Sequence, residues 1–322
     1  MNRRGFLAGV AAVGLLTACG RTDSPAAGSG GAWSFTDDRD RKVSLGQRPT
    51  RIVAQVSAAA ALWDLGVHPV GVFGPQKLKD GSNDPQVGVV DLSKVGSVGA
   101  EYGEFSMEKL AALRPDLLVS GMYKPPDLWY VTDDVKTKVE ALVPTLGISQ
   151  RSRNVLQVIE RFNELGKSLG AQQSVIDAAK ADFDKASDEL RQALAAKPGL
   201  RVLAVSAKAE NFYVGMPSDQ PDLSYYKTLG MDVGGATGDG VTYFEALSWE
   251  NTTKYPADLV LYDDRTQAGG LAELRTHPTW NSLPAVQAGQ VAPWRSETPF
   301  SYARFAPVLR ELAAAVGKAR KL

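Results

Sequence analysis

The sequence contains a single cysteine, Cys19, and only two histidines, His68 and His277, among 322 residues. One cysteine excludes an internal disulfide and any cluster of thiolate metal ligands. Two histidines are too few for a zinc site built from a group of histidines and acids. Each histidine precedes a proline, and we expect both to have packing roles.

An excess of either charge is also missing, since 36 basic residues balance 36 acidic ones and the formal net charge is zero. This balance indicates neither nucleic acid nor an acidic surface as a partner. A composition of 44% hydrophobic and 22% charged residues is typical of a globular protein. The length suffices for two ordinary domains.

No apolar run is long enough to span a bilayer, and the most apolar stretch, Phe6 to Leu16, follows Arg3 and Arg4. A charged start, a short apolar run and small residues are typical of a secretory signal, which predicts a signal peptide over residues 1–18. The twin arginines favour twin-arginine export. The sequence L-T-A-C resembles a lipobox, which predicts lipidation of Cys19, and residues 19–32 form a flexible tether. The alternative is an ordinary signal with a chance cysteine.

Beyond the tether, predicted strands alternate with predicted helices, which favours parallel sheets. Residues 152–170 carry apolar side chains at helical spacing and predict one long amphipathic helix in the middle of the chain. We therefore predict an α/β fold of two similar lobes with mainly parallel sheets, joined by one long crossing helix, with a ligand cleft between them. The N-terminal lobe covers residues 33–150, the connecting helix 151–170 and the C-terminal lobe 171–322.

Two segments repeat the pattern of a short helix, a proline-containing turn and a buried strand, at Ser106 to Val119 and at Ser248 to Leu261. Glu108 and Glu250 occupy the same position in the two repeats. An acid in the first turn of a helix is favoured by the helix dipole alone. The repetition of the whole block favours duplicated lobes.

Five further segments carry a resemblance, and they follow one another in the order Arg48–Ala54, Leu65–Val72, Lys94–Gly99, Met107–Leu118 and His277–Val291. Together with the lipobox and the central helix, they resemble the substrate-binding lipoproteins of bacterial ABC importers for iron–siderophore complexes, haem and cobalamin. The resemblance spans nearly the whole mature chain. It implies a monomeric binding protein without a cofactor, anchored at the outer face of the cytoplasmic membrane, whose cleft closes little on binding. It also implies that Glu108 and Glu250 dock onto arginines of the importer, with Glu104 as a competing residue.

Aromatic and cationic side chains gather where strands are expected to end, which is where ligands bind in open α/β sheets. Tyrosine and tryptophan offer apolar faces with a polar edge, and arginine donates to anionic oxygens. These residues suit a ferric siderophore, in which the iron is already wrapped in oxygens, with the hydroxamate type favoured. The candidates are Tyr102, Tyr123, Trp129, Tyr130, Phe212, Tyr213, Tyr243, Arg265, Trp294, Arg295, Phe300 and Tyr302.

Two motifs that suggest chemistry fail on context. The segment Gly166 to Gly170 matches G-x-S-x-G but ends a predicted helix, whereas a nucleophile elbow follows a strand. A phosphate loop would need a glycine at position 161, which is Arg161. We therefore expect a binding protein and not an enzyme. Haem or cobalamin, a surface-anchored hydrolase, and an adhesion or signalling protein remain as alternatives.

Overall fold

The computed structural model describes residues 31–208, 210–238, 242–265 and 270–322. The predicted signal peptide, Cys19 and most of the predicted tether lie outside these residues. In the described part of the chain, no helix combines the length and the apolar character that a membrane span requires.

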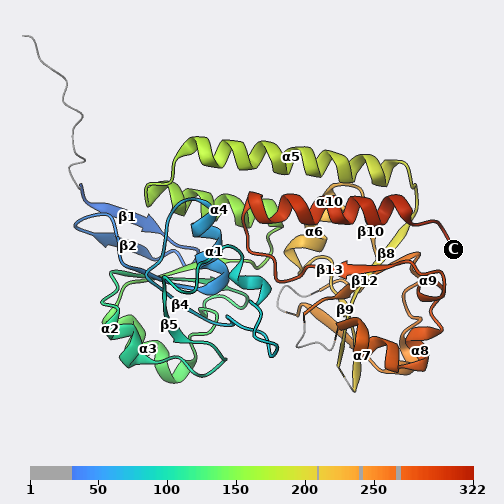
Figure 1. The fold of residues 1–322 in the computed structure, drawn as a ribbon, viewed down its shortest axis with the longest axis horizontal. Coiled ribbons are helices and arrows are strands. Elements are labelled where there is room, and N and C mark those ends of the chain that lie inside the picture. Colours follow the sequence, from blue (N-terminus) through green and yellow to red (C-terminus); the bar gives the residue numbers. More distant parts are fainter. Residues whose placement is uncertain (1–30, 209, 239–241, 266–269) are drawn as a thin grey trace, which may run out of the picture.

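Two lobes, each built on its own sheet, lie side by side beneath a layer of long helices (Figure 1). The N-terminal lobe begins with an antiparallel hairpin of β1 (Trp33–Thr36) and β2 (Lys42–Leu45). Its main sheet is entirely parallel and has the order β5-β4-β3-β6-β7. These strands are β3 (Ile52–Gln55), β4 (Gly71–Phe73), β5 (Gly96–Gly99), β6 (Leu117–Met122) and β7 (Thr145–Ser149).

The C-terminal sheet has the order β11-β9-β8-β12-β13, and β10 also pairs with β8. Apart from β10, its strands taken in chain order repeat the arrangement of the N-terminal sheet, as duplicated lobes predict. One strand is inverted, because β9 is the next strand after β8 and pairs with it antiparallel. The strands are β8 (Arg201–Lys208), β9 (Asn211–Gly215), β10 (Asp232–Val233), β11 (Phe244–Leu247), β12 (Leu259–Asp263) and β13 (Val291–Trp294).

Helices cover the sheets and connect the lobes. The N-terminal lobe carries α1 (Val56–Asp64), the 3-10 turn η1 (Pro85–Val87), α2 (Met107–Ala112), α3 (Asp133–Leu142) and α4 (Val155–Ser168). They are followed by α5 (Gln173–Ala195), α6 (Pro221–Thr228), the 3-10 turn η2 (Trp249–Asn251), α7 (Gly270–Thr276), α8 (Pro278–Asn281), α9 (Pro284–Gln287) and α10 (Tyr302–Lys318).

The central helix predicted at 152–170 is present as α4, but it is not the helix that crosses between the lobes. Gly166 lets α4 lie close to α1, since a Cβ there would stand 2.5 Å from Leu65 Cδ1. Gly170, with a φ of 100°, then turns the chain. The 23-residue helix α5, about 35 Å long, runs above both sheets (Figure 1). The single crossing helix therefore exists, but it lies within the segment assigned to the C-terminal lobe.

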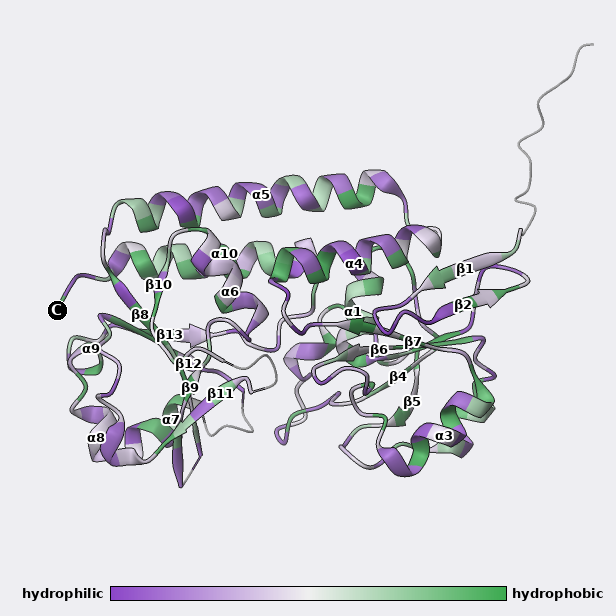
Figure 2. Cartoon of the chain, turned by 180° about the vertical axis from the view of Figure 1, so that it is seen from behind, coloured by the Kyte–Doolittle hydropathy of each residue, from purple (hydrophilic) through white to green (hydrophobic). Residues whose placement is uncertain are grey.

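One apolar core continues from the first sheet into the second beneath these helices. It contains the buried face of α4, including Val158 and Phe162, and the buried faces of α5 and α10. Figure 2 shows hydrophobic strands below helices whose outer sides are hydrophilic. At the junction of the lobes, the Asp64 carboxylate at the end of α1 lies 3.1 Å from Arg304 Nε of α10 and accepts a hydrogen bond from Ser301. The lobes are thus joined by packing and not by a flexible hinge alone.

The importance of α5 to this shared core can be tested with Phe183→Ala. Phe183 is 1% exposed, and its ring lies 5.1 Å from Tyr302 and 5.5 Å from Tyr225. The substitution should lower the free energy of unfolding by about 3–5 kcal/mol, measured by urea denaturation. Val175→Ala is the matched control, because Val175 is 41% exposed on the same helix, and it should change that energy by less than about 0.5 kcal/mol. Equal effects of the two substitutions would contradict a core that depends on α5.

Candidate functional site

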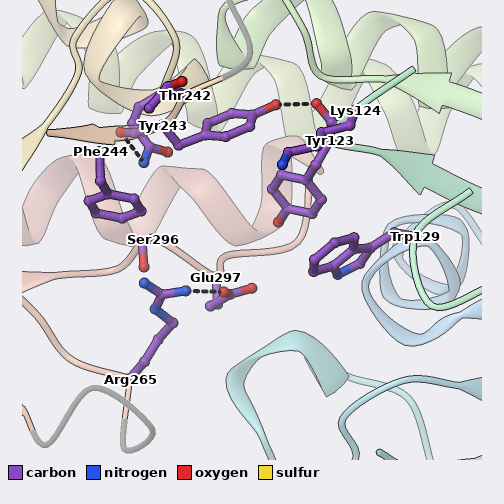
Figure 3. A pocket seen from close by; sticks show the side chains of 10 residues that line it. Tyr123, Lys124, Trp129, Thr242, Tyr243, Phe244, Arg265, Ser296 and Glu297 are labelled. Atoms are coloured by element: carbon purple, nitrogen blue, oxygen red, sulfur yellow. Dashed lines mark hydrogen bonds and ion pairs between the residues drawn. The ribbon is translucent and has the colours of Figure 1, made fainter. Parts of the chain in front are cut away.

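A cavity of about 400 Å³ lies between the two lobes (Figure 3). Strand ends of both sheets supply its walls: Tyr123 follows β6, Arg265 follows β12, and Ser296 and Glu297 follow β13. This is the position expected for a ligand in an open α/β sheet. The described lining residues are Tyr123, Lys124, Trp129, Gln220, Thr242, Tyr243, Phe244, Arg265, Ser296 and Glu297.

The N-terminal wall is an aromatic cluster held by the backbone of β6. The backbone N–H of Trp129 donates to the Gly121 carbonyl at 2.9 Å, and the backbone carbonyl of Trp129 accepts from Ser120 Oγ at 2.9 Å. The Trp129 ring lies 4.8 Å from that of Tyr123 and 5.5 Å from that of Tyr130. Two fixed backbone contacts and two ring contacts therefore orient the Trp129 indole before any ligand arrives.

A hydrogen bond connects the lobes across the cavity. The Tyr243 hydroxyl donates to the Tyr123 carbonyl at 2.6 Å, and the two rings meet edge to face at 5.6 Å (Figure 3). Burial raises the pKa of Tyr243 to about 12, and burial followed by the charge of Glu297 raises the pKa of Tyr123 well above its usual value. Both phenols therefore stay protonated at neutral pH and act as hydrogen-bond donors.

The C-terminal wall contains a chain of charges, Asp263–Arg265–Glu297. Arg265 Nε donates to Asp263 Oδ1 at 2.8 Å, and Nη1 donates to Glu297 Oε1 at 2.9 Å. Burial opposes the charge of Arg265, but its bonds to Asp263 and the charge of Glu297 outweigh burial and raise its pKa. Burial also raises the pKa of Glu297, which Arg265 partly offsets. One arginine is thus shared between two carboxylates.

The structure brings together four of the sequence-predicted ligand residues, Tyr123, Trp129, Tyr243 and Arg265, as cavity lining. Tyr102 and Tyr130 do not line the cavity but extend its aromatic cluster, with ring centroids 5.6 Å apart. Tyr102 is 64% exposed at the edge of this cluster. Tyr213 on β9 stands behind the wall, where its ring meets that of Phe244 at 6.3 Å.

Trp294 and Arg295, which the sequence also predicted as ligand contacts, lie elsewhere. Trp294 is 1% exposed, and its indole N–H donates to the Asp222 carboxylate inside the C-terminal lobe. Burial raises the pKa of Asp222 to about 6, although this hydrogen bond opposes the shift. Arg295 points away from the cavity to Glu311, at 2.9 Å, and to Asp264. Both predictions are corrected, because β13 turns these two side chains into the core and onto α10.

Three further candidates belong to the core. Tyr302 is 4% exposed at the start of α10 and packs on Phe183. Phe212 on β9 is fully buried against Trp249, and Phe300 is buried against Phe305. An aromatic residue beside polar neighbours in the sequence is therefore a weak signal for a cavity, because buried aromatics show the same local pattern.

Six lining residues were missed at the sequence level, namely Lys124, Gln220, Thr242, Phe244, Ser296 and Glu297. Lys124 directly follows the predicted Tyr123, and Phe244 directly follows Tyr243, so their neighbours gave a usable signal. No local sequence pattern indicated Glu297, since its partner Arg265 is 32 positions away and follows a different strand. The contact arises only because β12 and β13 are adjacent in the sheet.

The structure places Glu108 and Glu250 on the surface of different lobes. Glu108 is exposed in the first turn of α2, which Ser106 caps by accepting from the Lys109 N–H at 3.3 Å. Glu250 is exposed on the three-residue 3-10 turn η2, where the sequence predicted a short helix at the start of the Ser248–Leu261 repeat. The neighbouring Trp249 ring stacks on that of His277 at 3.4 Å. Glu104, the competing residue, is also exposed.

The histidines and the glycine motif have packing roles. His68 lies 4.3 Å from Trp63, and His277 stacks on Trp249. Gly166 and Gly170 serve the packing and the end of α4, as described above. Among the described residues, no group of three or more histidines, cysteines or acids could hold a metal ion.

Comparisons with known proteins agree with this geometry. The model of the periplasmic binding protein family matches residues 52–298. The crystal structure of DesE, a ferric-siderophore receptor protein from Streptomyces coelicolor, is 43% identical, with a TM-score of 0.83, and the match covers 90% of this chain and 99% of that one.

More distant relatives share the architecture. The petrobactin-binding protein YclQ from Bacillus subtilis is 16% identical with a TM-score of 0.69, covers 89% of this chain and 99% of its own, and is similar in fold. The Fe(3+)-citrate-binding protein YfmC from Bacillus subtilis is 22% identical over 255 residues, 79% of this chain and 76% of that protein. The family match over most of the chain and the two-lobed α/β fold lead to one conclusion: this chain belongs to the periplasmic binding protein family.

Proposed function

We propose that this protein captures a ferric siderophore in the cavity between its lobes and delivers it to the membrane subunits of an ABC importer. The observation that carries the proposal is the cavity itself, with an aromatic wall from one lobe and a charged wall from the other. The 43% identical relative described as a ferric-siderophore receptor supports the same ligand class. Binding without catalysis is proposed, because the matching family and the 43% identical relative are described as a binding protein and a receptor.

The charges of the cavity support a hydroxamate siderophore over other types. Arg265 is neutralised by Asp263 and Glu297, and Lys124 is exposed. A ferric tris-hydroxamate complex is neutral, whereas ferric catecholate and citrate complexes are anionic. An anionic complex would have to leave water for a site with no spare buried positive charge among the described lining residues, which is costly.

Ligand class and site are tested together by titrating intrinsic tryptophan fluorescence with ferric hydroxamate, catecholate and carboxylate siderophores, haem and cobalamin. We expect the ferric hydroxamate to bind most tightly. Trp129→Ala should weaken that binding by about 1–3 kcal/mol, because a central aromatic contact is lost. Trp294→Phe is the matched control, since it should lower stability by removing the donor to Asp222 Oδ2 but keep the affinity unchanged. If Trp294→Phe weakens binding and Trp129→Ala does not, the site lies at Trp294. If haem or cobalamin binds most tightly, the proposed siderophore ligand is wrong.

Delivery is proposed to use Glu108 and Glu250, one exposed carboxylate on each lobe. The core shared by the lobes restricts the relative movement of these two points. Charge pairs with importer arginines mainly set orientation and encounter rate. Glu108→Ala and Glu250→Ala should therefore keep ligand affinity and reduce uptake of labelled ferric complex by cells, with the double variant worse than either. Glu104→Ala tests the competing residue on the N-terminal lobe, and reduced uptake by this variant would move the docking point there. Normal uptake by the double variant would reduce both residues to ordinary surface acids.

Cys19 is the proposed site of lipidation, and the N-terminal arginines are proposed to direct twin-arginine export. Cys19→Ala should release the protein from the membrane fraction without changing ligand affinity, measured by fractionation and by fluorescence titration. If the variant stays with the membrane, the lipid anchor is wrong. Replacing both Arg3 and Arg4 with lysine should block export, and normal export of that variant would indicate the general secretory route. The released protein is expected to be monomeric.

A further inference from the structure

The charge chain on the C-terminal wall has one more negative charge than positive charge. Asp263 is fully buried and, with Glu297, shares the single cation Arg265. Two ionised carboxylates and one guanidinium leave a net charge of −1. Lys124 does not cancel this charge at close range, because it is exposed and screened by solvent. On the facing lobe, Asp84 adds a further buried acid whose charge acts on Glu297.

Glu297 is the member of the chain that a ligand can reach. Its side chain is 17% exposed, while that of Asp263 is 0% exposed. Arg265 occupies Oε1, and no described residue donates a hydrogen bond to Oε2. Figure 3 shows the Glu297 carboxylate between Arg265 and the Trp129 ring, among the residues that line the cavity. A carboxylate oxygen that lines a cavity and has free acceptor capacity can accept a hydrogen bond from a ligand.

Aromatic rings surround the same space. Tyr123, Trp129 and Phe244 line the cavity together with Glu297. The faces of tyrosine, tryptophan and phenylalanine rings attract cations, and the attraction grows where water is excluded. A carboxylate among aromatic rings is the chemistry that recognises an alkylammonium group.

We propose that Glu297 and the surrounding aromatic rings form a subsite for a positively charged, amine-bearing arm of the siderophore. This inference rests on the proposed function and adds to it the charge of the ligand. The iron centre needs no charge from the protein, since a ferric tris-hydroxamate is neutral. The pendant arm supplies the charge that neutralises Glu297 on binding.

The test uses three ferric complexes of one linear tris-hydroxamate that differ only at the end of the chain. The parent carries a free primary amine and is cationic, its N-acetyl derivative is neutral, and its N-succinyl derivative is anionic. The wild-type protein should bind the cationic complex about tenfold more tightly than the neutral one and bind the anionic complex most weakly, as expected for a charge pair that is only partly screened. Dissociation constants come from fluorescence quenching.

Variants of Glu297 distinguish the effect of its charge on binding from the effect of its size. Glu297→Gln should reduce the preference for the cationic complex over the neutral one to less than about threefold. Glu297→Asp keeps the charge and should retain the preference. Glu311→Gln is the matched control, because Glu311 pairs with Arg295 on α10 outside the cavity and should behave as wild type. Thermal unfolding of each variant reports whether the protein still folds when the charge chain is changed.

The outcomes distinguish this inference from the function on which it rests. If wild-type protein binds all three complexes tightly and equally, or if Glu297→Gln keeps the full preference, the cation subsite is wrong and the siderophore function stands. If none of the three complexes binds, the proposed hydroxamate ligand itself is wrong.

Discussion

The apolar core that runs without interruption from one sheet to the other is the constraint on which the rest of the structure depends. Each sheet must bury its upper face, and α4, α5 and α10 bury both faces together. Once the lobes share this core, they cannot separate without exposing it. The loops at the opposite strand ends therefore face each other across a fixed gap, and that gap is the cavity. Closure around a ligand is expected to be small, because bending must strain packed helices and not only a loop.

Hydrogen bonds between polar groups of the cavity walls give the cavity a defined shape. The Tyr243–Tyr123 hydrogen bond joins the lobes, and Asp263 and Glu297 fix Arg265 from two sides. Groups that are bonded to one another before binding lose little freedom when a ligand arrives, so less binding energy is spent on ordering them. The same bonds lower the capacity of Arg265 to attract an anion. Preorganisation and the proposed preference for uncharged or cationic ligands thus have one structural origin.

Periodicity in the sequence predicted most of the fold. The apolar stripe over 152–170 predicted α4, and the alternation of strands and helices predicted two lobes with parallel sheets. Periodicity did not reveal which helix crosses, because an apolar stripe does not show over which lobe a helix lies; the chain turns at Gly170 before α5 begins. It also missed β9, because the five residues of this strand are too few to show a clear period.

The sequence predicted only those site residues whose position depends on where a single strand ends. Tyr123 and Trp129 follow β6, and Arg265 follows β12, so strand ends located them. Trp294 and Arg295 also stand at a strand end, yet one side chain enters the core and the other pairs with Glu311. Alternation along β13 sets those directions, and a one-residue difference in register reverses them. Glu297 required the adjacency of β12 and β13, which no local pattern contains.

The central claim is that the ligand's iron lies between the lobes, with the aromatic wall on one side and the charged wall on the other. Anomalous X-ray diffraction at the iron absorption edge, from crystals grown with a ferric tris-hydroxamate, measures this position directly. We predict one strong iron peak in the cavity between Tyr123, Trp129 and Arg265. An iron peak outside this cavity, or a siderophore seated on the surface of a single lobe, would contradict the proposal.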